Sequence, residues 1–311
     1  MSSLVDTNKV IDAIVASDSG PLAKQEAARL VETWIASMPK FGDSSWKSVG
    51  VEMPFYIRLA EKTVVVGMMD RLASSPEHGV VGGEWKSRRA PKIKKDGTPY
   101  MGDTEGDWLA EISEGAQLAT YALAMREGAF LYKEEKEPAW APLIAEPILL
   151  VRACVKSTPA QIWPKNWEAG VFKFPKDVLD SVRSAYLVKA EQIRAARKSG
   201  LVPWQLTGYQ CKSYNRMCEF YGDCKKRIYA PPAPVAFHPT DPGFEAAKRL
   251  GLDATDPELV VLSQSGYAAV SQCTEKWRRV YDGHAPGETS FELEVGAALH
   301  AGLAAVYEQL R

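Results

Sequence analysis

The sequence lacks any long hydrophobic run and any large excess of charge. None of its apolar stretches approaches the ~20 residues that span a bilayer. The segment MSSLVDTNKVIDAIVASDSG also lacks the basic start and apolar core of a secretory signal. A net charge of -1 and a pI near 6.5 mean that nucleic acid would have to bind through local patches. We therefore expect a cytoplasmic protein without a membrane partner.

Cysteine is scarce and unevenly distributed. The 311 residues include five cysteines, and three of them, Cys211, Cys218 and Cys224, have the spacing C-x6-C-x5-C. Because disulfides are rare in a reducing compartment, this spacing favours a metal site, with buried free thiols as the alternative. Cys154 lies in an apolar segment and is expected to be a core residue.

The composition that remains is that of a folded α/β protein. With 46% hydrophobic and 25% charged residues, the chain can form one large domain or two ordinary ones. No internal repeat or low-complexity tract interrupts it. The Pro-rich segment 230–243 is predicted to be a linker. Apolar spacing predicts helices over 22–38, 114–127, 176–200, 243–250, 265–282 and 291–310, and strands over 49–59, 62–70, 79–87 and 146–157.

Two carboxylates are associated with neighbouring predicted strands. Asp70 ends one strand, Glu84 lies near the end of the next, and Lys86 shares a face with Glu84 because strand side chains alternate. Paired carboxylates suit Mg²⁺ or Mn²⁺. Together with an ammonium group, such a site could activate water for phosphodiester hydrolysis. The alternative is that Asp70 and Glu84 only pair with Arg71 and Arg88 at the surface.

These residues resemble the PD-(D/E)XK nuclease superfamily, and specifically its RecB-like branch. In that branch the pattern G-x-x-D-R ends one strand and (D/E)-x-K ends the next. The matching residues here are Gly67, Asp70, Arg71, Glu84 and Lys86. The resemblance implies that Asp70 and Glu84 bind the metal ion and that Lys86 positions or activates the attacking water.

The same branch has a downstream helix with the pattern Q-x-x-x-Y. The segment QLATYALA supplies Gln117 and Tyr121, one helical turn apart. By the resemblance, these two residues contact the catalytic site or the nucleic acid. The alternative is that they form the polar edge of an ordinary helix.

An N-terminal element of the RecB-like branch resembles the other end of this chain. Its pattern, S-x-S-x6-C followed by G-x-x-x-H on a helix, matches nothing before Asp70. It is similar instead to Ser263, Ser265, Cys273, Gly296 and His300. The resemblance therefore implies a circular permutation in which His300 joins Asp70 and Glu84 as a metal ligand.

Permutation is physically reasonable because domain termini lie at the surface and are often close together. Two alternatives are open: His300 is an ordinary helix residue, or residues 259–311 complete the site of a neighbouring chain. The expected fold is α/β, a restriction-endonuclease-like core with a mixed central sheet flanked by helices, circularly permuted, with a cysteine-ligated cluster region. Residues 1–229 would form the main part of the nuclease domain, 230–258 a linker, and 259–311 the permuted N-terminal element.

The resemblance also suggests a cofactor for the cysteines. Some RecB-like nucleases hold a [4Fe-4S] cluster with a C-terminal cysteine triplet and the cysteine of the N-terminal element. The corresponding residues are Cys211, Cys218, Cys224 and Cys273. Zn²⁺ is the alternative, because thiolates suit both. The first two cysteines lie further apart here than in the family's frequent C-x2-C.

A basic segment follows Lys86. The sequence KSRRAPKIKK could neutralise phosphates and give salt-dependent, sequence-tolerant binding of DNA. Its alternative interpretation is a solvated surface loop. The predicted DNA contacts are Arg88, Arg89, Lys92, Lys94 and Lys95.

The sequence thus predicts a metal-dependent DNA nuclease, and its resemblance to RecB-like and CRISPR-adaptation nucleases implies an exonuclease acting on DNA ends or single strands. Recombination or CRISPR-adaptation proteins are the further partners that the resemblance implies. Among enzymes, the alternative is an endonuclease or end-processing subunit of such a complex. In another class, the alternative is a non-catalytic DNA-binding or assembly module. Clustered carboxylates argue against that module, because a site without turnover has no physical need for them.

Overall fold

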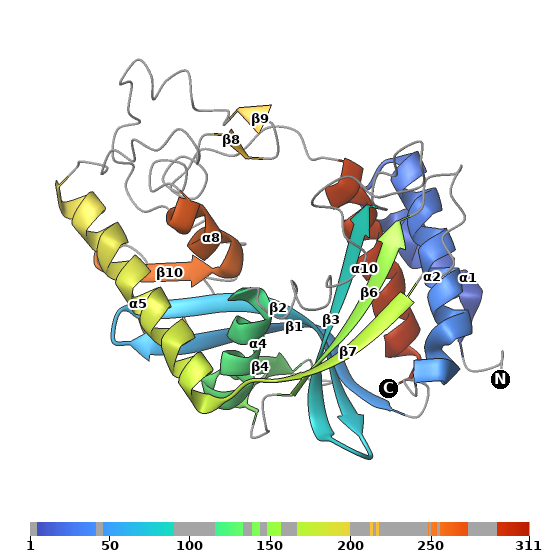
Figure 1. Ribbon diagram of the computed structural model, residues 1–311, viewed down its shortest axis with the longest axis horizontal. Helices are drawn as coiled ribbons and strands as arrows, with labels where there is room; N and C mark the ends of the chain where they lie inside the picture. The colour runs from blue at the N-terminus through green and yellow to red at the C-terminus, as the bar shows by residue number, and fades with distance from the viewer. Residues whose placement is uncertain are drawn as a thin grey trace, which may run out of the picture. The chain divides into compact units, whose positions relative to one another are not determined.

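The computed structural model describes residues 5–41, 46–89, 116–132, 139–143, 148–156, 167–199, 212–213, 216–217, 248, 250–253, 256–272 and 291–310. Its helices are α1 (Thr7–Ala16), α2 (Pro21–Phe41), α4 (Ala116–Glu127), α5 (Lys176–Ser199), α8 (Gln264–Gln272) and α10 (Phe291–Glu308). Its strands are β1 (Lys47–Ala60), β2 (Thr63–Ser75), β3 (Gly79–Arg89), β4 (Ala129–Tyr132), β5 (Ala139–Pro142), β6 (Ile148–Lys156), β7 (Trp167–Lys173), β8 (Lys212–Ser213), β9 (Arg216–Met217) and β10 (Val260–Ser263) (Figure 1).

The main sheet is mixed, as predicted. Its strand order is β5-β4-β1-β2-β3-β6-β7, with β10 pairing β2 off this path. β2 and β3 are antiparallel, β3 and β6 are parallel, and β6 and β7 are antiparallel. Helix α4 packs against β3 and β6, and α2 packs against β6 and β7. The prediction of a mixed central sheet flanked by helices is therefore confirmed.

The strands that contain the predicted site residues are longer than the sequence suggested. We expected Asp70 to end its strand, and this was wrong: β2 continues to Ser75. It continues because Arg71 to Ser75 pair with Gly83 to Gly79 of β3, and Leu72 and Ala73 are buried. β3 likewise extends beyond Lys86, because its residues up to Arg89 pair with β6.

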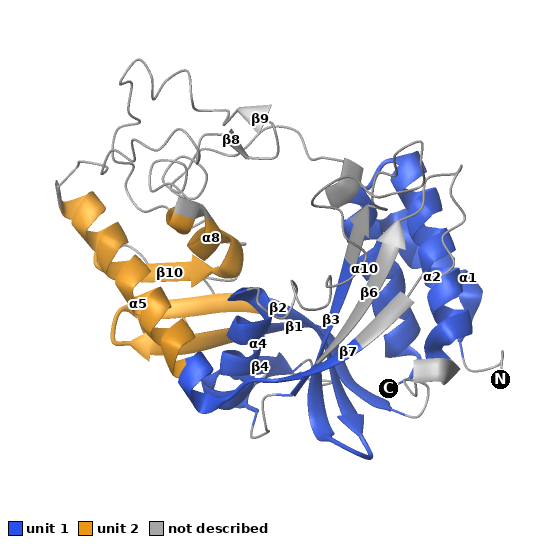
Figure 2. Ribbon diagram, viewed as in Figure 1, with its two compact units in different colours: residues 1–55, 68–179, 288–311 blue, residues 56–67, 180–287 orange. Residues whose placement is uncertain are grey.

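The chain divides into two compact units (Figure 2). Unit 1 comprises Met1–Phe55, Met68–Leu179 and Glu288–Arg311, and unit 2 comprises Tyr56–Gly67 and Asp180–Gly287. All predicted site residues whose side chains are described lie in unit 1. Most of the predicted linker 230–258 falls outside the described residues, so the expected domain boundaries stay a prediction.

The first helix, α1, was not expected from the sequence. Asp6 precedes it, and its side chain accepts a hydrogen bond from the Asn8 backbone N–H (3.0 Å), which is the interaction that favours aspartate at a helix start. Val10 and Ile14 lie one turn apart on its buried face. Six of the described strands, β4, β5, β7, β8, β9 and β10, were also not expected; each spans only two to seven residues.

In unit 1 the C-terminal helix α10 packs against the N-terminal helices α1 and α2 (Figure 1). The three helices share a core that includes Val10, Leu30, Leu299 and Leu303. Hydrogen bonds also join chain segments near the two ends, such as the bond from the Asp6 backbone N–H to Gln309 Oε1 (2.6 Å). Helix α10 is thus part of the same unit as β3, α4 and the portion of β2 from Met68 onward.

No helix in the described part of the chain has both the length and the apolar character that a membrane span requires.

Candidate metal and active site

Strand pairing places Asp70 and Glu84 in neighbouring positions on β2 and β3. Arg71 pairs with Gly83, so the residues before and after this pair, Asp70 and Glu84, lie next to each other. Both are buried, with exposed fractions of 5% and 1%. Asp70 Oδ2 accepts a hydrogen bond from the Trp85 backbone N–H (2.8 Å), which fixes this carboxylate against β3.

Lys86 and Gln117 complete a hydrogen-bonded group around Glu84. Lys86 forms an ion pair with Glu84, and its Nζ donates to Gln117 Oε1 (2.7 Å). Gln117 Nε2 donates to Glu84 Oε1 and to the Tyr121 hydroxyl, both at 2.9 Å. The amide oxygen of Gln117 accepts from Lys86 and its amide nitrogen donates twice, so Lys86 is held from two sides, by Glu84 and by Gln117.

Gln117 and Tyr121 extend from α4 toward this group. Tyr121 lies in the buried run of α4 from Leu118 to Met125, and the half-buried Gln117 bonds to Glu84 and Lys86, so the pair does not form a solvated helix edge. Tyr121 is only 5% exposed and packs edge-on against Phe55, with ring centroids 5.7 Å apart. It therefore supports Gln117 from within the core.

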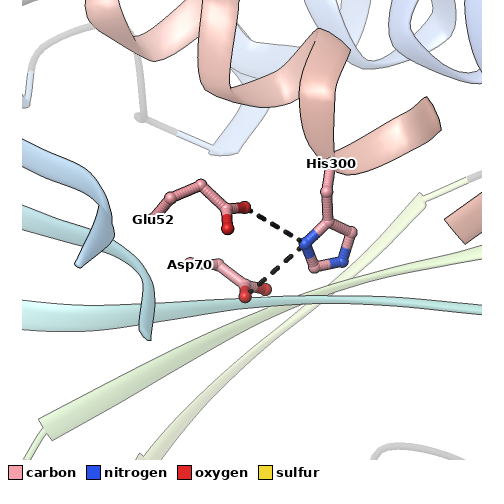
Figure 3. Close-up of side chains that lie close together, drawn as sticks. All are labelled: Glu52, Asp70 and His300. Carbon is pink, nitrogen blue, oxygen red and sulfur yellow. Dashed lines mark ion pairs between the residues drawn. The ribbon is translucent and has the colours of Figure 1, made fainter. Parts of the chain in front are cut away.

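His300 of α10 approaches Asp70 within the same chain. Its Nδ1 lies 3.6 Å from Asp70 Oδ1 and 3.4 Å from Glu52 Oε1 (Figure 3). One ligand atom from each of the three residues lies within 4.8 Å of the others. Two carboxylates and an imidazole at this separation could share one divalent cation.

Sequence reasoning missed Glu52. It lies in β1, where the next residues alternate between a buried side chain at Met53 and Phe55 and a partly exposed one at Pro54 and Tyr56. In the sequence it is therefore an unremarkable acidic residue on the more polar face of a strand. Its backbone φ of 48° is the exceptional feature, and the sequence offers no signal for it.

Burial changes the acidity of the two central carboxyl groups. It raises the pKa of Asp70 to about 7, against the opposing effect of the Trp85 hydrogen bond. Burial also raises the pKa of Glu84 to about 8, and the neighbouring charge of Asp70 adds to the effect. Desolvation further raises the pKa of the Tyr121 hydroxyl well above its ordinary value. The fold thus disfavours ionised carboxylates here unless a cation compensates them.

Two carboxylate oxygens without hydrogen-bond partners in the described part of the chain point to a cation site more directly than the pKa values do. Glu84 Oε2 and Glu52 Oε1 are buried and have no hydrogen-bond partner among the described residues. Buried polar atoms normally have a partner, since leaving one without costs about 1–3 kcal/mol. A hard divalent cation such as Mg²⁺ or Mn²⁺ would satisfy these oxygens, so the residues fit the group that the sequence predicted.

Aromatic contacts fix the helix that carries His300. Trp85 packs edge-on against the His300 ring at 5.8 Å between centroids and stacks on Tyr307 at 5.2 Å. The Arg71 guanidinium lies 3.7 Å from the Tyr307 ring centroid, and Trp34 Nε1 donates to the Tyr307 hydroxyl (2.9 Å). The strands of the site and helices α2 and α10 are thereby packed together at the metal site.

The remaining predicted residues are not placed in detail. Arg88 and Arg89 belong to β3, but their side chains are outside the description, as is the side chain of Cys154 in β6. Seven others lie outside the described residues altogether: Cys211, Cys218, Cys224, Cys273, Lys92, Lys94 and Lys95. The cysteine cluster and the DNA contacts therefore stay predictions.

Comparison with protein-family models matches residues 7–225 to the PD-(D/E)XK nuclease superfamily. The match covers well over half of the chain and includes Asp70, Glu84, Lys86, Gln117 and Tyr121, and it ends before α10. No curated protein and no solved structure matches the chain.

Proposed function

Because the chain belongs to the PD-(D/E)XK nuclease superfamily, we propose that it is a metal-dependent DNA nuclease, and specifically a RecB-like exonuclease acting on DNA ends or single strands. The observation behind this proposal is that the buried carboxylates of Asp70 and Glu84 lie on paired strands beside Lys86, which Glu84 and Gln117 hold in place. Two buried carboxylates beside an oriented ammonium are the groups that metal-assisted phosphodiester hydrolysis requires.

In this mechanism Asp70, Glu84 and His300 would hold the cation. A bound Mg²⁺ or Mn²⁺ would polarise the phosphodiester and lower the pKa of a bound water. Lys86 Nζ is held by Glu84 and Gln117 while its side chain stays 32% exposed, so it can hydrogen-bond to the attacking water or to a phosphate oxygen. Tyr121 and Gln117 act through Glu84 and Lys86, and their role is to position these two groups.

Circular permutation of the RecB-like order is part of the proposal. It is supported by His300, which reaches Asp70 from α10, beyond the end of the family match. It is also supported by the packing of α10 against α1 and α2, which places the permuted segment in the same unit as Asp70 and Glu84. Because α10 packs into the core of its own unit, His300 can complete the site within one chain, and a neighbouring chain is not needed.

The proposal also includes a structural metal site formed by four cysteines. Cys211, Cys218, Cys224 and Cys273 would bind a [4Fe-4S] cluster, with Zn²⁺ as the alternative. Anaerobically purified protein should then contain about four iron atoms per chain, as expected for that cluster, and absorb visible light. Zinc in place of iron would favour the alternative, and the absence of both would refute a metal at these thiols.

DNA would be held in part by the segment after Lys86. Arg88, Arg89, Lys92, Lys94 and Lys95 are the proposed phosphate contacts, and recombination or CRISPR-adaptation proteins are the proposed further partners. Neutral substitutions in this segment should weaken DNA binding and reduce its salt dependence without changing the preference for any sequence.

Linear and covalently closed DNA distinguish the proposed exonuclease from its alternatives. With Mn²⁺, the wild-type protein should release nucleotides from linear DNA and leave closed circles intact. Cleavage of closed circles would instead favour an endonuclease. The Lys86→Ala variant should bind DNA and fail to cleave it, while Lys47→Ala, at the exposed start of β1, should behave as wild type. DNA binding without cleavage by any form would favour the non-catalytic module.

A further inference from the structure

Glu52 lies beside the proposed metal ligands without belonging to the sequence pattern that identified them. We propose that Glu52 is a direct ligand of the divalent cation, together with Asp70 and His300, and that this mixed oxygen and nitrogen set binds Mn²⁺ more tightly than Mg²⁺. The inference rests on the proposed metal-dependent function and adds to it a ligand and a preference between metals.

The distances suit one shared cation. Ligand atoms about 2.1 Å from an octahedral ion lie about 3.0 Å apart when adjacent and about 4.2 Å apart when opposite. His300 Nδ1 lies 3.4 Å from Glu52 Oε1 and 3.6 Å from Asp70 Oδ1, between these limits. Figure 3 shows the three side chains directed toward one another. Small side-chain adjustments would therefore bring all three atoms onto one ion.

Charge and hydrogen bonding independently call for a cation at this place. Glu52, Asp70 and Glu84 are three carboxylates around one ammonium, that of Lys86. A divalent cation would balance the excess of negative charge that remains when all three are ionised. Glu84 is 1% exposed. Among the described residues, neither Glu84 Oε2 nor Glu52 Oε1 has a hydrogen-bond partner. These oxygens are the positions at which a hard cation would bind.

The backbone supports the same assignment. Among the described residues, Glu52 is the one non-glycine residue with a positive φ, at 48°. This left-handed conformation is unfavourable for a residue with a Cβ atom, and such conformations cluster at functional sites. A glycine would adopt it more easily and would lack the carboxylate. The presence of glutamate in this unfavourable conformation is explained if its side chain binds the cation.

The metal preference follows from the ligand types. Carboxylate and carbonyl oxygens serve Mg²⁺ and Mn²⁺ alike, whereas an imidazole nitrogen suits transition metals better. Mg²⁺ also dehydrates reluctantly and is usually bound by one or two carboxylates with several waters. A site that includes an imidazole beside its carboxylates should therefore favour Mn²⁺.

Titration of the metal-free protein with Mn²⁺, followed by electron paramagnetic resonance and calorimetry, tests the assignment. Wild type should bind Mn²⁺ more tightly than Mg²⁺, and Glu52→Gln should weaken Mn²⁺ binding by a factor of about 10 or more. Glu52→Gly should lose the same affinity while removing the backbone strain, so that a folding defect does not explain the loss. Glu61→Gln, in the exposed turn after β1, is the matched control and should bind as wild type.

Unchanged Mn²⁺ affinity in both Glu52 variants would overturn the assignment. A wild type that prefers Mg²⁺ would overturn the metal preference. These outcomes are separate from the proposed nuclease function. If wild type cleaves DNA but the Glu52 variants bind Mn²⁺ normally, only the ligand assignment fails; if Glu52→Gln weakens Mn²⁺ binding and no form cleaves DNA, only the nuclease proposal fails.

Discussion

Replacing Glu84 with glutamine should stabilise the metal-free protein, and the gain should grow as the pH rises. Glu84 is 1% exposed, and burial together with the charge of Asp70 raises its pKa from 4.5 to about 8. Glutamine has nearly the shape of the protonated acid and does not titrate. The variant therefore removes the cost of ionising a buried carboxyl group while changing the packing little.

The sign and size of the effect follow from the pKa difference. A carboxyl group whose pKa is raised in the folded state stabilises it fully below the unfolded-state pKa, and this stabilisation is lost as the pH rises through the folded-state pKa. For Glu84 the loss occurs between pH 4.5 and about 8. At about 1.4 kcal/mol per pKa unit, it amounts to something on the order of 5 kcal/mol.

Urea denaturation in the presence of EDTA, at several pH values from about 4.5 to about 8.5, measures the effect. The free energy of unfolding of Glu84→Gln should match that of wild type at the lowest pH and exceed it by several kcal/mol at the highest. Excess Mg²⁺ should narrow the difference, because the cation binds the ionised wild-type site. A difference that does not change with pH, or a variant less stable than wild type at high pH, would refute the reasoning.

Three further predictions concern how α10 is held and can be checked by urea denaturation. Gly302→Ala would place a Cβ 2.8 Å from Ile14 Cδ1, so it should lower the free energy of unfolding by about 1–3 kcal/mol; no loss would show that the helices can separate freely. Gly296→Ala on the same helix meets nothing within 4 Å and should raise it by about 0.5–1 kcal/mol; a loss there would point to a contact with residues outside the description. Tyr307→Phe removes the buried hydrogen bond from Trp34 and should cost about 1–2 kcal/mol; a neutral result would mean that this bond contributes nothing net.

The sequence predicted the parts of the site that depend on local patterns. Alternating apolar residues located β1, β2 and β3, and helical spacing located α4, so Glu84 and Lys86 could be placed on one face and Gln117 and Tyr121 one turn apart. The extension of β2 beyond Asp70 was missed, because it depends on pairing with β3 and not on its own pattern.

Features set by distant parts of the chain were harder to predict. The resemblance of the segment around His300 to a family element indicated that it approaches Asp70, whereas nothing local placed Glu52 beside it. The positive φ of Glu52 could not be predicted, because the sequence has no glycine at this position. Helix α1 has two buried apolar residues and takes its place through packing against α2 and α10. Short strands such as β10 form through pairing with β2 and have too few residues to show a period.

The most direct test of the central claim is release of label from end-labelled linear DNA by wild type and by Glu84→Gln, each with Mn²⁺ and with EDTA. The account predicts release by wild type only when the metal is present, and none by Glu84→Gln, whose greater stability would exclude unfolding as the cause. Metal-independent release, or equal release by the two proteins, would contradict the claim that this buried carboxylate is part of a metal-dependent nuclease site.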